Sequence, residues 1–142
     1  MNDDFGHGRA PSVPTVFFFD RDVGTALPRA LDILKLPTQF EHHQEHFPID
    51  SRDDSWMPVV GDHGWTLIGH DSRHHLEDAE LSAIKQYEMG CFYLWGAEAM
   101  RWEKMLCFLR AYEKILDAAV RTPKPFIYRV SQKGGLTPVI LP

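Results

Sequence analysis

The apolar run TVFFF at residues 15–19 constrains the fold more than any other part of this sequence. A strand with one face open to solvent alternates apolar and polar side chains, and this run shows no such alternation. A short, continuously apolar and β-prone run is typical of a strand in the centre of a sheet that helices cover on both faces. The run therefore predicts an α/β fold with a central, mostly parallel sheet.

Strand-like and helix-like segments alternate after this run, as in sheets whose parallel strands are joined by helices. Further strands are expected at residues 38–43, 65–69 and 91–95, and helices at 24–36, 77–88 and 98–120, with a short helix that Asp53 or Asp54 begins and that ends near Gly61 or Gly64. The segments TPKPFIYRV and LTPVIL, joined by a QKGG turn, predict a C-terminal β-hairpin. The helix at 98–120 is amphipathic, with an apolar stripe at Trp102, Met105, Leu106, Leu109, Tyr112 and Leu116.

Length and composition indicate one folded domain. The 142 residues suffice for a single core, and residues 1–14 are polar, rich in glycine and proline and without periodicity. We therefore expect a flexible tail at 1–14 followed by one domain at 15–142. The formal net charge is −5, so binding of a nucleic acid requires a local basic patch. Part of that negative charge is itself the binding site if several acids converge on a cation.

The two cysteines and the hydropathy pattern bear on location. Cys91 and Cys107 lie in apolar stretches and are expected to be core residues. The sequence does not begin with a basic and then apolar leader, so we expect reduced thiols and a cytoplasmic location. No apolar run reaches the roughly 18 residues that a membrane-spanning helix needs, so no membrane association is expected.

Acidic residues follow two of the predicted strands. Asp20 and Asp22 come after VFFF, and Asp71 comes after TLIGH. Ligands of open α/β sheets gather at the carboxyl ends of the strands. Asp53 and Asp54, at the start of the short helix, are expected at the same end of the sheet. These acids predict a metal site. The alternative interpretation is local, with turn-forming aspartates after the strands and Asp53 as a helix N-cap.

Repulsion between neighbouring acids supports the metal interpretation. Asp20 and Asp22 face one point if the extended backbone persists through Arg21, because strand residues two apart share a side. Two carboxylates about 4 Å apart repel by about 4 kcal/mol at an effective dielectric constant near 20. A hard divalent cation relieves that repulsion.

The stretch from FFFDRDVG through DSRDDSWMPVVGDHGWTLIGHD to PKPFIYRVS resembles the PIN-like domain family related to VapC-type toxin ribonucleases. The shared pieces are a strand ending in Asp-x-Asp, an Asp-x-x-Trp element, Gly-Trp opening a strand, a strand-end Asp and a late Pro-Phe-Ile strand. The resemblance spans roughly Val16 to Val130. It implies a three-layer fold and an Mg²⁺- or Mn²⁺-dependent endoribonuclease, the toxin of a toxin-antitoxin system, with an RNA substrate, an antitoxin partner and a homodimeric state.

The resemblance also implies roles for individual residues. Asp20 resembles the metal ligand of the first strand, Asp53 or Asp54 the acid on the helix, and Asp71 the acid at the end of a strand, with Asp22 as an additional ligand. Asp20, Asp53 and Asp71 are the implied catalytic residues.

The sequence departs from the wider PIN pattern at the fourth acid of the site. The fourth strand, CFYLWG, ends without an aspartate and Glu98 is only a distant substitute, which leaves open whether one metal binds or two. Arg73 and His74, with His75, directly follow Asp71 and are expected to contact the phosphate backbone of RNA, although exposed residues at the start of a helix are the plainer interpretation.

Two other functions remain as alternatives. FFFDRDVGTAL also resembles the first motif of haloacid dehalogenase-type phosphatases, with Asp20 as nucleophile and Asp22 as general acid, but the sequence offers no well-placed Ser/Thr and Lys pair. The other alternative is a non-catalytic interaction module, whose binding surface Trp95, Trp102 and the hairpin supply.

Histidines and tryptophans elsewhere have simpler interpretations. His42, His43 and His46 invite a zinc site, but the strand expected there spoils their spacing and no cysteine lies nearby. They are therefore interpreted as structural or surface histidines. Trp56 and Trp65 are expected in the core.

Overall fold

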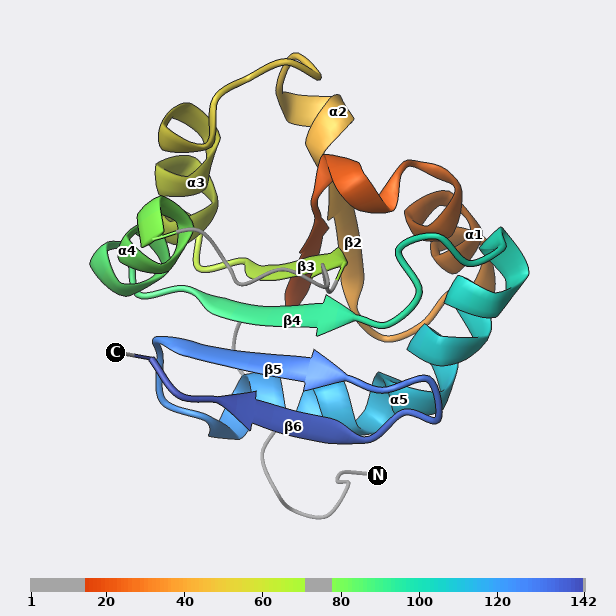
Figure 1. The fold of residues 1–142 in the computed structure, drawn as a ribbon. Helices are drawn as coiled ribbons and strands as arrows, with labels where there is room; N and C mark the ends of the chain where they lie inside the picture. The colour runs from red at the N-terminus through yellow and green to blue at the C-terminus, as the bar shows by residue number, and fades with distance from the viewer. Residues whose placement is uncertain (1–14, 71–77, 142) are drawn as a thin grey trace.

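The computed structural model describes residues 15–70 and 78–141. Its centre is a six-stranded sheet in the order β2-β1-β3-β4-β5-β6 (Figure 1). The strands are β1 (Val16–Phe19), β2 (Gln39–His42), β3 (Thr66–His70), β4 (Gly90–Leu94), β5 (Phe126–Val130) and β6 (Leu136–Val139). All neighbours pair in parallel except β5 and β6, which form the antiparallel C-terminal hairpin. The predicted mostly parallel sheet and closing hairpin are confirmed.

Helices cover both faces of this sheet. They are α1 (Ala26–Leu34), α2 (His43–His46), α3 (Asp53–Asp62), α4 (Asp78–Gln86) and α5 (Arg101–Arg121), with the 3-10 helix η1 (Arg21–Val23) after β1. Figure 1 shows α1 and α5 together on one side of the sheet and α3 and α4 together on the other. Among the described residues, no helix is both long and apolar enough to cross a membrane.

The central strand β1 is buried on both faces. Phe17 and Phe19 pack with α1 and α5, and Phe18 packs with α3 and α4. Each of the three side chains is 0% exposed. Because successive side chains of a strand point to opposite faces, a strand covered on both sides needs apolar residues at every position. The TVFFF run therefore forms the central strand that the sequence predicts.

The buried stripe of α5 differs from the predicted one. Trp102, Leu106 and Leu109 are exposed, and the helix buries a neighbouring stripe. That stripe consists of Cys107, Phe108, Ala111, Tyr112, Ile115 and Ala118. The ring of Phe108 in this stripe contacts the rings of Phe17 and Phe19 on β1. The predicted stripe is therefore wrong at Trp102, Leu106 and Leu109 and right at Tyr112, while Met105 and Leu116 are partly buried against the same core. Periodicity alone does not choose between two adjacent apolar stripes.

The second strand is shorter than expected. β2 ends at His42, and the chain turns into α2 at His43, where the sequence had predicted continued strand. The Oε1 atom of Glu45 accepts a hydrogen bond from the backbone N–H of His42 at 3.0 Å. A Glu side chain that satisfies a free backbone N–H three residues earlier stabilises a helix start, which explains why the strand stops there.

A close approach between β4 and β5 gives a testable prediction. Gly90 lies opposite Phe126, and a Cβ added to Gly90 would lie 2.4 Å from two carbons of the Phe126 ring. Gly90→Ala should therefore lower the free energy of unfolding by about 1–3 kcal/mol, because overpacking forces neighbours out of position. Urea unfolding of Gly90→Ala, Phe126→Leu and the double variant measures this. We expect the double variant to lose less free energy of unfolding than the two single variants lose together. Strictly additive losses would show that residues 90 and 126 do not clash.

Candidate functional site

The candidate site lies where β1 and β3 end side by side. The backbone N–H of Asp20 donates to the carbonyl of Ile68 at 2.9 Å, which fixes Asp20 at the carboxyl edge of the sheet. Because β1 and β3 run in parallel at the centre of the sheet, this edge is where polar residues of both strands meet. Asp71, Arg73, His74 and His75 lie outside the described residues.

The chain turns immediately after β1. Asp20 caps η1, and its Oδ1 atom accepts a hydrogen bond from the backbone N–H of Arg21 at 2.6 Å. The predicted extended backbone, which would place Asp20 and Asp22 on one side of a strand, does not persist through Arg21, and this prediction is wrong. The physical reason is local, since an aspartate side chain that bonds a nearby backbone N–H competes with strand geometry.

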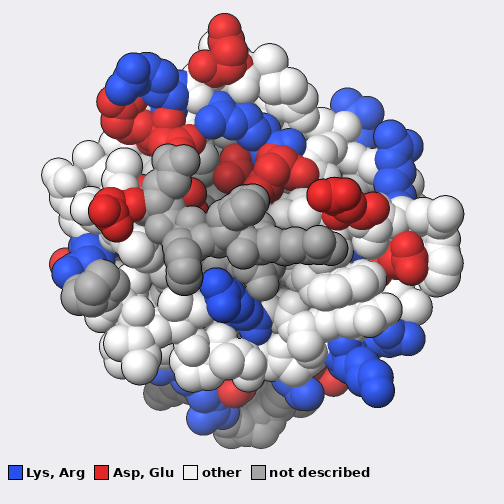
Figure 2. All heavy atoms as spheres, viewed as in Figure 1, with Lys and Arg blue, Asp and Glu red and all other residues white. Residues whose placement is uncertain are grey.

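The turn nevertheless keeps Asp22 at the same edge. Its Oδ2 atom accepts a hydrogen bond from the backbone N–H of His70, the last residue of β3, at 3.4 Å. The charge of Asp22 acts on Asp20 and raises its pKa. Figure 2 shows acidic side chains gathered over the η1 segment with basic side chains beside them. The two acids thus meet through η1 and not through strand periodicity.

Asp20 has the most unusual electrostatic environment of these acids. Burial, and next the charge of Asp22, raises the pKa of Asp20 to about 7. Desolvation of its carboxyl also raises the pKa of Asp22, even though the residue as a whole is exposed. The hydrogen bond from His70 and the charge of Lys104 oppose this rise. Burial and then Lys104 lower the pKa of His70 to about 4, so this histidine is neutral near pH 7. The edge therefore holds negative charge that His70 does not balance.

Asp53 also reaches this region, but protein groups already bind it. Its Oδ1 atom accepts hydrogen bonds from Arg21 Nη2 at 2.9 Å and from Trp56 Nε1 at 3.1 Å. Arg21 also donates to the carbonyls of Ile49 and Ser51. Together these bonds hold the loop before α3 against η1. The charge of Asp53 contributes to the raised pKa of Asp20, which places the two acids within electrostatic reach.

The start of α3 differs from the predicted one. Arg52 is the N-cap and makes no capping bond through its side chain, and Asp53 and Asp54 are the first residues inside the helix. The predicted N-cap role of Asp53 is therefore wrong, because its carboxylate is taken by Arg21 and Trp56. Asp54 forms an exposed ion pair with Arg52 at 3.2 Å. The structure places Asp22 and Asp53 within electrostatic reach of Asp20 and leaves Asp54 on the outer surface.

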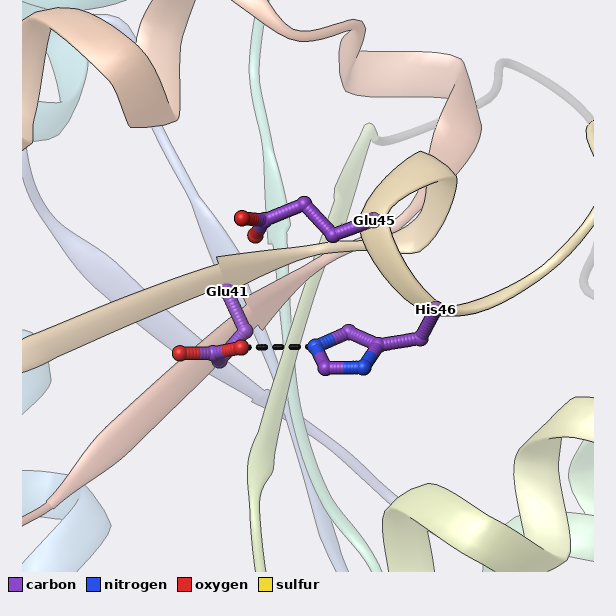
Figure 3. Close-up of side chains that lie close together, drawn as sticks. All are labelled: Glu41, Glu45 and His46. Atoms are coloured by element: carbon purple, nitrogen blue, oxygen red, sulfur yellow. Dashed lines mark hydrogen bonds and ion pairs between the residues drawn. The ribbon is translucent and has the colours of Figure 1, made fainter.

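Within the described residues, one group of three acids and histidines has potential ligand atoms that all lie within 4.8 Å of one another. It consists of Glu41, Glu45 and His46 (Figure 3). His46 Nε2 lies 2.6 Å from Glu41 Oε1, and Glu45 caps the start of α2. Asp20, Asp22 and Asp53 do not form such a close group. The sequence analysis missed the Glu41 group because it expected a strand where α2 forms; the spacing Glu41-x-x-x-Glu45-His46 was the available signal.

The remaining predicted residues lie as follows. His43 is fully buried among Phe18, Phe47 and Trp56, which makes it a structural histidine. Both cysteines are buried, and burial raises the pKa of each thiol, so the core assignment of Cys91 and Cys107 is confirmed. The core position of Trp56 is also confirmed, whereas Trp65 is partly buried and packs against that core. Glu98 lies in an exposed turn between β4 and α5.

The raised pKa of Asp20 makes the metal-free protein sensitive to pH. The carboxyl takes up a proton near pH 7 when folded and near pH 3.8 when unfolded. Stability from this group is therefore present at low pH and lost as the pH rises through 7, by on the order of 2–4 kcal/mol. Asp20→Asn keeps a capping side chain but no charge. In EDTA, its melting temperature should exceed that of the wild type at pH 8, and the difference should shrink towards pH 5.

The matched control for this measurement is Asp54→Asn, because Asp54 is exposed and paired with Arg52. It should show no stabilisation that grows with pH. If Asp20→Asn melts below the wild type at pH 8, the carboxylate of Asp20 is a structural cap and carries no stored repulsion.

Comparison with known proteins gives one family match. The chain matches the family described as "PIN like domain" over residues 15–96, which is more than half of its length. The matched segment includes β1, η1, α3 and β3, and so contains the acids at the carboxyl edge. No curated protein and no solved structure matches the chain. The chain belongs to the family of PIN-like domains.

Proposed function

We propose that this chain is an Mg²⁺- or Mn²⁺-dependent ribonuclease whose metal site is built on Asp20 and Asp22. The observation that carries the proposal is the half-buried carboxylate of Asp20, whose pKa rises to about 7 beside Asp22 at the centre of the sheet edge. Perturbed acids that share a sheet edge are typical of functional sites. PIN-like domains form a superfamily that includes nucleases, which supports the same function.

The ligand atoms at this edge suit the proposed cations. Asp20 and Asp22 offer only oxygen, the ligand type that Mg²⁺ and Mn²⁺ prefer, and both cysteines are buried in the core. A bound cation would supply Lewis-acid stabilisation of a phosphodiester and a more acidic bound water. By sequence, Asp71 would add a third carboxylate directly after β3, and Arg73 and His74 would follow it as contacts to phosphate.

Other groups of the chain orient the ligands and supply positive charge. The hydrogen bond from the Arg21 backbone N–H fixes the orientation of the Asp20 carboxylate. The guanidinium of Arg21 joins Asp53 to the carbonyls of Ile49 and Ser51, and so holds α3 at the site. Lys104, whose charge lowers the pKa of Asp22, provides a cation for a phosphate oxygen beside the acids.

The non-catalytic interaction module is the second candidate. Two observations favour it: Asp53 is already bound by Arg21 and Trp56, and Trp102 is largely exposed. Binding of Mn²⁺ at Asp20 separates the two candidates. The phosphatase alternative predicts transient phosphorylation of Asp20, and the family match gives it no support.

The resemblance to VapC-type toxins supports a more specific proposal. On that basis the chain would be the toxin of a toxin-antitoxin pair, with an antitoxin protein as its partner, a homodimeric state and a cytoplasmic location. Light scattering tests the dimer, and a monomer mass at all working concentrations would contradict it. Growth arrest on expression, relieved by the product of a neighbouring gene, tests the toxin role.

Metal binding gives the first prediction of this proposal. Mn²⁺ should raise the melting temperature of the wild type, by an amount that corresponds to about 2.7 kcal/mol at a concentration 100 times the dissociation constant. Asp20→Asn should abolish most of this shift because it removes a charged oxygen ligand. Glu41→Gln is the matched control, since Glu41 belongs to the other acidic group, and it should keep the shift. A shift kept in Asp20→Asn and lost in Glu41→Gln would place the metal at α2 and contradict the proposal.

Catalysis gives the second prediction. Asp20→Asn and Asp71→Asn should each reduce Mn²⁺-dependent cleavage of RNA by at least about 100-fold, because metal sites lose affinity steeply when a ligand or its support is removed. Asp54→Asn should cut RNA at close to the wild-type rate, since its carboxylate pairs with Arg52. Cleavage is measured on an end-labelled RNA with and without EDTA, and circular dichroism confirms folding. Wild-type protein that binds Mn²⁺ but cuts no RNA would exclude the ribonuclease.

A further inference from the structure

A cavity of about 540 Å³ lies directly beside the acids, between η1, the start of α1 and the start of α5. Asp22 lines it, so the cavity and the proposed metal site share a residue. Figure 1 shows the two helices next to each other at this end of the molecule. The volume falls within the roughly 300–1,000 Å³ that is usual for small-ligand sites, which is enough for one nucleotide.

The cavity concentrates positive charge in a protein of net charge −5. Arg21, Arg101 and Lys104 line it together with Asp22. Arg21 is bound to Asp53, whereas Lys104 and Asp22 line the same cavity and the charge of Lys104 acts on Asp22. This is the local basic patch that binding of a polyanion to an acidic protein requires.

An aromatic side chain completes the lining. Trp102 is 63% exposed although it lies on the helix that buries Phe108 and Tyr112. Met105, from the next turn of α5, lines the cavity with it. An exposed indole ring next to several cations matches how proteins hold single-stranded nucleic acids, by stacking on a base and pairing with its phosphates.

We infer that this cavity binds one nucleotide of a single-stranded RNA, with its base stacked on Trp102 and its phosphate held by Lys104 and Arg101. A base inside a duplex is stacked on its neighbours and cannot stack on the protein, so the cavity selects unpaired RNA. The position beside Asp22 sets this nucleotide next to the phosphodiester to be cut. That placement rests on the proposed ribonuclease function, whereas binding of the nucleotide itself does not require cleavage.

Binding is measured by fluorescence anisotropy of an end-labelled RNA of about eight nucleotides, in EDTA so that no cleavage occurs. Trp102→Ala should raise the dissociation constant about tenfold, since one stacked base is lost. Trp102→Phe should stay within about threefold of the wild type because a phenyl ring also stacks. Lys104→Ala should weaken binding and reduce its salt dependence by about one phosphate contact. Leu109→Ala, an exposed position on α5 outside the cavity, should change nothing.

The base itself provides the sharpest test. An RNA with abasic sites should bind the wild type about tenfold more weakly than the intact RNA does. The Trp102→Ala variant should bind the abasic RNA and the intact RNA with equal affinity. An RNA duplex of the same sequence should bind the wild type weakly. Equal affinity of wild type and Trp102→Ala for intact RNA overturns the inference. So does a wild type without RNA affinity whose self-association depends on Trp102, because the surface then binds protein.

The same variants separate this inference from the proposed function. If the wild type binds RNA through Trp102 and cleaves none, the ribonuclease proposal fails and the nucleotide site stands. If the wild type cleaves RNA and Trp102→Ala binds and cleaves equally well, the ribonuclease stands and the nucleotide site is refuted.

Discussion

The burial of β1 on both faces is the constraint on which the rest of this structure depends. Three consecutive phenylalanines have no exposed surface, so β1 must lie at the centre of the sheet with helices on each side. The residue that follows them is Asp20, which is therefore held at the carboxyl edge, half-buried and next to a second acid. Apolar packing thus positions a charge where water solvates it poorly, and this desolvation is the main cause of the raised pKa of Asp20.

The architecture follows from local patterns, which is why so much of it could be predicted. Unbroken apolar runs mark the central strands, and the two glycines of the QKGG turn mark the hairpin. The errors occur where a single side chain decides between two acceptable local structures. Glu45 ends β2 by capping α2, Asp20 starts η1 by bonding the next N–H, and Phe108 with its small neighbours selects one of two apolar stripes on α5. Periodicity carries no information about such choices.

The candidate site was predicted only in part, because its remaining features depend on contacts between distant residues. The position of Asp20 and Asp22 after a buried strand was readable from the sequence. The hydrogen bond between Arg21 and Asp53 could not be predicted, because the two residues are 32 positions apart in the sequence. This bond occupies a carboxylate oxygen that a metal would otherwise use. The basic cavity could not be predicted from the sequence either, because its lining residues come from η1 and the start of α5, which are about 80 residues apart in the chain. The exposure of Trp102 depends on which stripe of α5 packs against the sheet, and the sequence leaves that choice open.

The proposed function depends on a metal site formed by the carboxylates at the end of β1. Anomalous diffraction from crystals soaked in Mn²⁺ tests it most directly, since it locates the ion without reference to activity. We expect an anomalous peak beside the carboxylates of Asp20 and Asp22, within the roughly 2.0–2.6 Å of metal–oxygen coordination. A peak only at Glu41, Glu45 and His46, or none at either group in crystals saturated with Mn²⁺, would rule out a metal site at the end of β1.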